Sequence, residues 1–273
     1  MLKFIPTLIL GFTLIPLAEA TCPNGKSYPV TLTFDDGPKS GLTPKVLDIL
    51  KEENIKATFF VLGENFPGGK SNPANKEAYA LLDREKAEGH YIGSHTYHHL
   101  EHSKMTTEQM RTNINKSNPL LKDYMSPILR LPYGDGSFRS SNPAKQAKND
   151  QVMKTIKDAG LKHVGWDIDT NDWDAKKRSI LVSSMLKQIC STHGGIILFH
   201  DVQANTVKHL KEWIGIIRKE GHTIVGLEQF VSGLPKPQVA PVCDETQIPT
   251  KTVNELDSTV NQVMEKIPEE KTE

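Results

Sequence analysis

The sequence has no excess charge of either sign. Lys and Arg together number 33, as do Asp and Glu, so the formal net charge of the 273-residue chain is zero. Proteins that bind nucleic acid or anionic membranes through charge carry a basic excess. We therefore expect neither partner, and substrate recognition must depend on shape and local contacts.

Long hydrophobic stretches of the kind that span a bilayer are also missing. The apolar run at residues 4–17 is interrupted by Thr, Gly and Pro. It is shorter than the roughly 20 residues that a transmembrane helix needs. Lys3 precedes the run, and the small-residue cleavage pattern Ala18-Glu19-Ala20 follows it, as in a signal peptide. We therefore expect residues 1–20 to be cleaved, and the mature protein to be secreted or periplasmic without a membrane span.

Cysteine is scarce, with Cys22, Cys190 and Cys243 as the three examples. In an exported protein, one disulfide and one free thiol is the simple outcome. Because the two ends of a domain often lie close together, the pair Cys22–Cys243 is favoured. Cys190 lies in a segment with apolar periodicity, which predicts a buried thiol. The sequence alone leaves the other pairings open.

After residue 28, strand-like and helix-like segments alternate. Short β-rich runs occupy residues 30–34, 57–62, 91–93, 127–131, 163–166, 195–199 and 222–225, with helical patterns at 43–53, 75–88, 106–122, 148–159, 176–190 and 207–219. Thr43 is the expected N-cap of the first helix, with Pro44 at its first position. Such alternation implies parallel strands joined by right-handed crossovers. Seven or eight such units predict an irregular (β/α)7-8 barrel.

The rest of the chain divides into loops and a tail. Two long polar loops, residues 64–75 and 134–149, follow predicted strands, so they lie either at the substrate site or as simple surface insertions. Residues 21–233 are the predicted domain. Residues 234–273 are predicted to be a Pro-rich linker and an amphipathic helix, which packs on the barrel or binds a partner.

Two segments carry residues typical of a metal site. Asp35 and Asp36 end the first predicted strand, and adjacent residues of a strand point to different sides. His95 and His99 are four residues apart, a spacing that places both imidazoles on one face of a helical turn. Two His and one carboxylate leave a coordination position open, as in catalytic zinc sites; cobalt and nickel are alternatives.

Three more segments combine polar and aromatic residues at strand ends. They are Arg130 with the following Pro-Tyr-Gly turn, the stretch 166–173 with its alternating Asp and Trp, and His200 after an apolar run. The second lacks the Gly and distal Glu of a calcium loop. Acidic and aromatic residues together suit a sugar site, and a His there could protonate a leaving amine. Taken singly, each segment also suits a structural role.

Taken in order, the five segments resemble the polysaccharide deacetylase family (the NodB-homology domain, carbohydrate esterase family 4) over residues 28–233. The resemblance implies a NodB-type barrel and a role for each matching residue. It assigns Asp35 as the general base, oriented by Arg130, and Asp36, His95 and His99 as metal ligands. His200 is the implied general acid, with Asp169 as its partner, and the Tyr133 backbone N–H is the implied oxyanion donor. The implied substrate-binding residues are Tyr133, Trp173 and Leu198.

The implied reaction is hydrolysis of N-acetyl groups on polysaccharide sugars, with release of acetate. Peptidoglycan, at its N-acetylglucosamine or N-acetylmuramic acid residues, ranks first as substrate, and chitin-type oligomers rank second. The loops after Gly63 and Gly134 and the C-terminal tail depart from the family pattern, and these departures bear on the choice of substrate and not on the chemistry. Two alternatives stay open: an O-acetyl esterase acting on a xylan-type glycan, and a non-catalytic glycan-binding protein on the same fold.

Overall fold

The computed structural model describes residues 22–237, which fall within one compact unit of the chain. The predicted signal peptide, the predicted C-terminal helix and Cys243 lie outside the described residues. Within residues 22–237, no helix combines the length and the apolar character that a membrane crossing requires.

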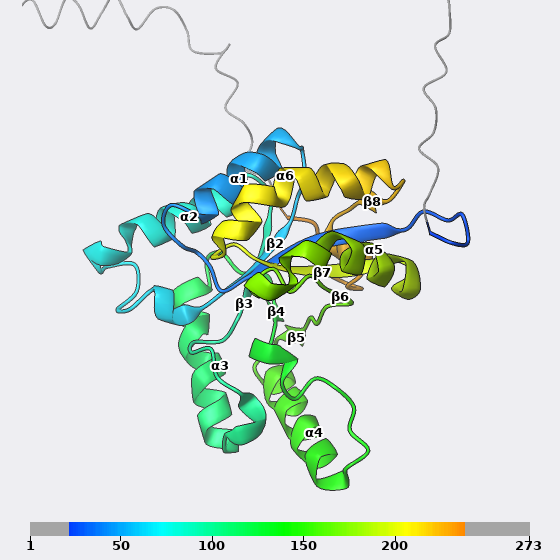
Figure 1. The fold of residues 1–273 in the computed structure, drawn as a ribbon. Coiled ribbons are helices and arrows are strands. Elements are labelled where there is room, and N and C mark those ends of the chain that lie inside the picture. The colour runs from blue at the N-terminus through cyan, green and yellow to red at the C-terminus, as the bar shows by residue number, and fades with distance from the viewer. Residues whose placement is uncertain (1–21, 238–273) are drawn as a thin grey trace, which may run out of the picture. The chain divides into compact units, whose positions relative to one another are not determined.

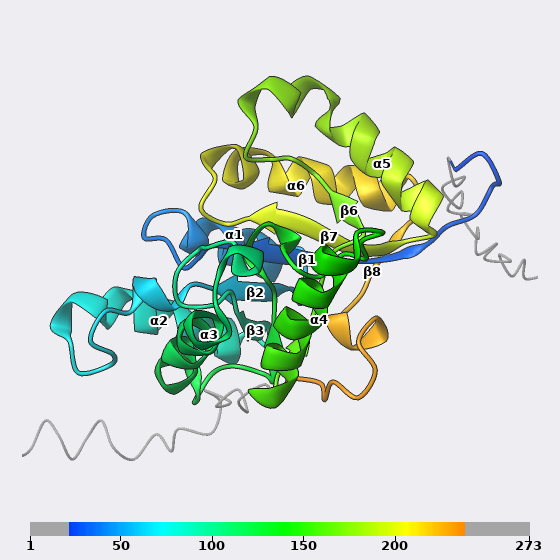
Figure 2. The same cartoon turned by 90° about the horizontal axis from the view of Figure 1, so that it is seen from below.

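Eight parallel strands form the central sheet. They are β1 (Pro29–Asp35), β2 (Thr58–Val61), β3 (Tyr91–Ser94), β4 (Ile128–Leu129), β5 (Lys162–His163), β6 (Ile168–Asp169), β7 (Gly195–His200) and β8 (Thr223–Ile224). Their order is β5-β4-β3-β2-β1-β7-β6, and β8 pairs with β1. The sheet curls through this order, and the short segment 164–167 links its two ends (Figures 1 and 2). The predicted irregular parallel barrel is thereby confirmed.

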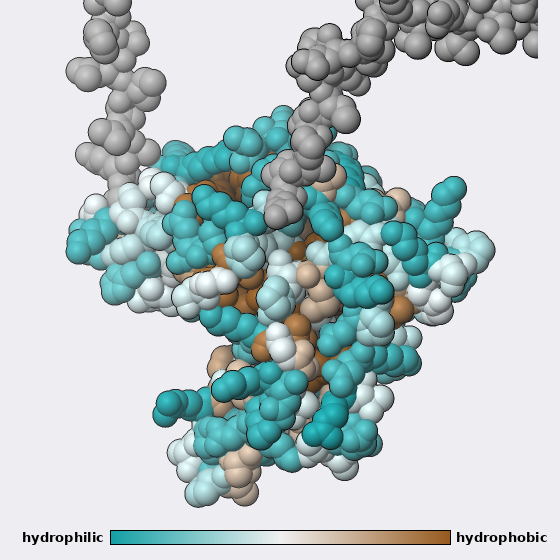
Figure 3. Space-filling model, turned by 180° about the vertical axis from the view of Figure 1, so that it is seen from behind, coloured by the Kyte–Doolittle hydropathy of each residue, from teal (hydrophilic) through white to brown (hydrophobic). Residues whose placement is uncertain are grey.

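Within residues 22–237, six α-helices surround the sheet, and three hydrophobic clusters hold them to it. The helices are α1 (Thr43–Glu52), α2 (Lys76–Ala87), α3 (Thr107–Leu121), α4 (Pro143–Asp158), α5 (Leu181–Thr192) and α6 (Ala204–Lys219). The largest cluster lies between the sheet and α1, α2, α5 and α6, a second one fills the barrel, and a third joins α3 to α4. Helices α3 and α4 extend away from the other helices (Figure 1). The face seen in Figure 3 is mostly hydrophilic, with its hydrophobic residues in recessed places.

Strand β1 is buried on both faces, as central strands of parallel sheets are. Leu32 and Phe34 pack in the cluster beneath the helices. Thr33 and Asp35 point to the opposite side, where both accept hydrogen bonds from one guanidinium group. The alternation of the strand therefore delivers Asp35 to the interior at the carboxyl end of the barrel.

Three local predictions were wrong in detail. The strand predicted at 163–166 is the two-residue β5, which ends at His163, and a further strand that was not predicted, β6, begins at Ile168. Helix α4 begins at Pro143, earlier than predicted, because the Asn142 side chain caps it by accepting from Lys145 N at 3.1 Å. Thr43 caps no helix: its hydroxyl accepts from Lys39 N at 2.8 Å and donates to Asp201.

The predicted cysteine pairing was also wrong. Cys22 forms a disulfide with Cys190, and their Cα atoms are 5.4 Å apart. Cys22 is buried in the largest hydrophobic cluster, against which Cys190 of α5 also packs. The N-terminal segment thus runs beside α5, so proximity of the chain ends does not decide the pairing. The bond closes a loop across most of the barrel, with a sequence separation of 168 residues.

Loss of this disulfide should destabilise the barrel, because an open chain has more entropy when unfolded. For Cys190→Ser we expect the free energy of unfolding in urea to fall by about 2–4 kcal/mol. Cys243→Ser serves as the matched control and should leave it unchanged. The reverse pattern, with Cys243→Ser destabilising and Cys190→Ser neutral, would contradict the pairing.

Candidate active site

The carboxyl ends of the strands enclose a cavity of about 320 Å³. Its lining includes every site residue expected from the sequence except Arg130, which is buried behind it. The lining residues are Asp35, Asp36, His95, His99, Tyr133, Trp166, Asp169, Trp173, Leu198, His200 and Gln203. Segments far apart in the sequence thus meet at one edge of the sheet, as in other parallel barrels.

Asp36, His95 and His99 converge on one point. Asp36 Oδ1 lies 3.4 Å from His95 Nε2 and 3.4 Å from His99 Nε2. This oxygen is buried and has no hydrogen-bond partner among the described residues. One carboxylate and two imidazole nitrogens whose atoms lie within 4.8 Å of one another are a ligand set that suits a divalent ion such as zinc. The residues present therefore fit the expected metal site.

The protonation states of Asp36, His95 and His99 also suit a metal site. His95 Nδ1 lies 2.9 Å from the carbonyl oxygen of Arg130, which can only accept, so Nδ1 carries the proton and Nε2 is free to bind a metal. Burial raises the pKa of Asp36, but His95 and the other nearby histidines outweigh it and lower the pKa to about 2. Burial and the neighbouring His95 lower the pKa of His99, which favours its neutral form.

The backbone is strained where the site needs it. Asp36, Thr96 and Tyr133 have φ angles of 78°, 69° and 59°, in the left-handed region that non-glycine residues rarely adopt. The turn at Asp36 is held by Asn65, whose Nδ2 donates to the carbonyl oxygens of Asp36 at 3.0 Å and Gly37 at 2.8 Å. No pattern in the sequence predicted this role for Asn65.

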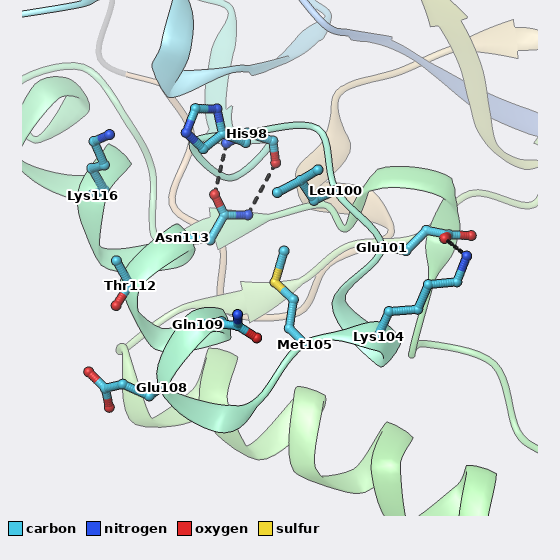
Figure 4. Close-up of a pocket in the computed structure, with 10 residues that line it drawn as sticks. All are labelled: His98, Leu100, Glu101, Lys104, Met105, Glu108, Gln109, Thr112, Asn113 and Lys116. Atoms are coloured by element: carbon cyan, nitrogen blue, oxygen red, sulfur yellow. Dashed lines mark hydrogen bonds and ion pairs between the residues drawn. The ribbon is translucent and has the colours of Figure 1, made fainter.

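Asn113 of α3 holds the turn between the two metal-site histidines. Its side-chain Oδ1 accepts from His98 N at 2.8 Å, and its Nδ2 donates to His98 O at 3.1 Å (Figure 4). Its main-chain oxygen accepts from Tyr97 N at 3.0 Å. The sequence analysis missed this residue as well. The local pattern offers one indication of its role: a polar Asn lies with Met110 and Ile114 on the buried face of the helix.

Arg130 fixes the orientation of Asp35. Its NH1 donates to Asp35 Oδ1 at 2.8 Å and to Thr33 Oγ1 at 2.7 Å. Its Nε and NH2 donate to the carbonyl oxygens of Val164 at 3.1 Å and Gly165 at 2.7 Å. Both partners of the ion pair are almost completely buried. A buried charge with this many partners holds the Asp35 carboxylate in one position.

Asp172, and not the predicted Asp169, is the partner of His200. Asp172 Oδ1 accepts from His200 Nδ1 at 2.7 Å, and Asp172 Oδ2 accepts from His200 N at 2.8 Å and from the Thr206 hydroxyl. Burial lowers the pKa of His200, but the Asp172 carboxylate outweighs burial and raises the pKa to about 9. Near neutral pH, the imidazolium can therefore donate a proton from Nε2 into the cavity.

The position of β6 explains the error. Asp169 of β6 pairs with Leu198 of β7, which is two residues before His200 on that strand. The Asp169 side chain therefore does not reach the His200 ring. Its carboxylate instead accepts from Asn171 N at 2.8 Å, and a positive φ of 52° at Asn171 turns the chain toward His200. The motif contains both carboxylates, and only the register of the strand distinguishes them.

Aromatic side chains flank the cavity opening. Tyr133 and Trp173 are 62% and 54% exposed, an unusual degree for large rings. The Tyr133 ring contacts His99 edge-on with ring centroids 4.5 Å apart, and Leu198 forms part of the cavity wall. Exposed rings beside buried polar groups are the arrangement that a sugar-binding cleft requires.

A curled parallel sheet with this constellation at its carboxyl ends defines a NodB-type barrel. The chain belongs to the polysaccharide deacetylase family, whose sequence model matches residues 23–164.

Named relatives agree with this assignment. The chain is 34% identical over 204 residues to the peptidoglycan-N-acetylglucosamine deacetylase PgdA of Listeria monocytogenes, covering 74% of this chain and 38% of that one. It is 32% identical over 172 residues to a chitooligosaccharide deacetylase of Sinorhizobium fredii, covering 63% and 71%. The solved Bc1960 peptidoglycan N-acetylglucosamine deacetylase is 28% identical with a TM-score of 0.58, covering 78% and 91%. The chain thus spans well under half of the Listeria enzyme.

Removal of the Asp172 charge should change the pH dependence of catalysis. If protonated His200 is required, activity falls as pH rises through its pKa, and Asp172→Asn lowers that pKa. We therefore expect the alkaline limb of kcat to move to lower pH, measured as acetate release across a pH series. Asp169→Asn is the matched control and should keep the wild-type limb. A shift in Asp169→Asn alone would reverse the assignment.

Replacement of Asn113 should weaken metal binding although Asn113 is not one of the proposed metal-ligating residues. Asn113→Ala removes both side-chain hydrogen bonds to the main chain of His98, and supporting residues of this kind typically contribute roughly 10- to 100-fold in metal affinity. Titration of metal-free protein with zinc measures the effect. Asn115→Ala, an exposed change on the same helix, is the control. Equal zinc affinity in both variants would show that Asn113 does not position the ligands.

Proposed function

We propose that the chain is a metal-dependent hydrolase that removes acetyl groups from N-acetylated sugars of a polysaccharide. The observation that carries the proposal is that one cavity holds an oriented carboxylate, a cationic imidazole and a three-residue metal site. Hydrolysis of an amide needs a base for water, stabilisation of the oxyanion, and an acid for the leaving amine.

Asp35 is the base in this scheme. Arg130 donates to its Oδ1, which leaves Oδ2 to take a proton from the attacking water. Asp36, His95 and His99 would hold a divalent ion, which would polarise the acetyl carbonyl and activate the water. Zinc is the ion that we propose, with cobalt or nickel as substitutes.

His200 and Tyr133 complete the scheme. The backbone N–H of Tyr133, in the turn with positive φ, is the proposed donor to the oxyanion of the tetrahedral intermediate. His200 then donates the Nε2 proton to the departing sugar amine, while Asp172 stabilises the imidazolium. An amine must be protonated to leave, so an acid with a raised pKa suits an amide better than an ester.

We propose peptidoglycan as the first substrate and chitin-type oligomers as the second. The relatives named above support both, since their names specify peptidoglycan N-acetylglucosamine and chitooligosaccharide. An exported protein would meet a cell-wall polymer, and residues 1–20 have the sequence of a signal peptide. Secretion or location in the periplasm is accordingly part of this proposal.

The direct experiment measures acetate released from purified peptidoglycan, N-acetylglucosamine oligomers and acetylated xylan. We expect release from the first two that stops with a chelator and returns with zinc. Asp36→Ala should stay inactive after zinc is added, because it lacks one ligand.

Other outcomes identify the alternatives. Release from xylan alone would replace the proposal by an O-acetyl esterase. Binding of glycan without any release from zinc-loaded protein would indicate a non-catalytic glycan-binding protein.

A further inference from the structure

We propose that loop 135–142 and the first half of α4 form a second sugar-binding subsite beside the active-site cavity. Its ligand is the neighbouring sugar residue of the same glycan strand. The inference rests on the proposed function, because it takes the acetylated sugar to lie in the active-site cavity. It also gives a role to the long loop after Gly134.

Phe138 connects the two sites. The side chain is 60% exposed, and its ring contacts Trp166 edge-on with centroids 6.2 Å apart. Trp166 itself lines the active-site cavity. The aromatic surface therefore continues from the cavity outward to Phe138. Pyranose rings have an apolar C–H face that packs on aromatic rings, whose faces carry partial negative charge.

The turn at Gly134 makes this contact close. A Cβ atom at Gly134 would lie 2.6 Å from the Phe138 ring and 2.9 Å from the Trp166 ring. Phe138 thus stands directly over the turn that follows Tyr133. A sugar stacked on Phe138 would adjoin a sugar whose acetamido group reaches the metal-site residues.

Beyond Phe138 lies a second cavity of about 500 Å³ with mostly polar walls. Arg139 and Asn149 lie in its lining, together with Gln146 and Asp150. Within residues 22–237, Arg139 has no ion-pair or hydrogen-bond partner, and the buried Oδ1 of Asn149 has none either. A free donor group and a free acceptor in one cavity match the hydroxyl groups of a sugar, which both donate and accept.

The loop is held in place by hydrogen bonds. Asn149 Nδ2 donates to Phe138 O at 2.6 Å, and Gln146 Oε1 accepts from Ser140 N at 2.8 Å. Ser137 Oγ donates to Gly134 O at 2.6 Å. Because α4 anchors the loop before any ligand arrives, little ordering cost opposes binding.

The experiment measures binding and chain-length dependence separately. Binding of the N-acetylglucosamine monomer and pentamer is measured by calorimetry in an Asp35→Asn background, which needs no turnover. We expect Phe138→Ala and Arg139→Ala to weaken pentamer binding roughly 3- to 10-fold, as for one lost stacking or polar contact, and to leave binding of the monomer, which does not reach the subsite, unchanged. Phe138→Tyr should restore pentamer binding, and Lys145→Ala, an exposed change on the same helix, is the control.

In the active protein, the same variants should raise KM for the pentamer and leave kcat unchanged. Pentamer binding that is equal in Phe138→Ala, Arg139→Ala and Lys145→Ala would overturn the subsite. Absence of acetate release from every glycan would instead refute the proposed function, while the binding measurements would still decide the subsite.

Discussion

The site depends on one buried guanidinium group. Arg130 is fully buried, and its side chain reaches the carboxylate of Asp35 and the main chain after β5. Its own carbonyl oxygen accepts the proton of His95 Nδ1. A single residue therefore aims the proposed base and sets the tautomer of a proposed metal ligand. A cation so deeply buried is tolerated only with such a set of partners. Because these partners include Asp35, the same hydrogen bonds stabilise the barrel interior and orient the active site.

Around this centre, strained turns are stabilised from neighbouring elements. Asp36 and Thr96 occupy left-handed backbone conformations that cost free energy in isolation. Asn65 offsets this cost at Asp36, and Asn113 does so for the turn that follows Thr96. Each uses an amide side chain, which can donate and accept at once. The geometry of the proposed metal site therefore depends on residues that are not among its proposed ligands.

The sequence predicted most of the site, since residues at strand ends in a parallel barrel necessarily converge. Each of these residues ends or follows a recognisable buried strand, so their meeting follows from the fold class: Asp35 and His200 end β1 and β7, Asp36 follows β1, and His95 and His99 follow β3. Asp172 could not be distinguished from Asp169, because the choice depends on the two-residue strand β6 and its register. Asn65, Asn113 and the Cys22–Cys190 bond depend on packing between distant segments, which local patterns do not report.

The spacing of the proposed metal ligands along the chain has a thermodynamic consequence. Asp36 follows β1 and His95 follows β3, and they meet only when both strands pair with β2. In the unfolded chain Asp36 is 59 residues away from His95, so the complete three-residue set does not form, although several histidines near His95 remain close together. An ion that occupies the site therefore binds the native state more tightly than the unfolded chain, and the folding equilibrium shifts toward the native state as its free concentration rises. In this way the supply of metal in the surroundings also sets how long the folded barrel persists.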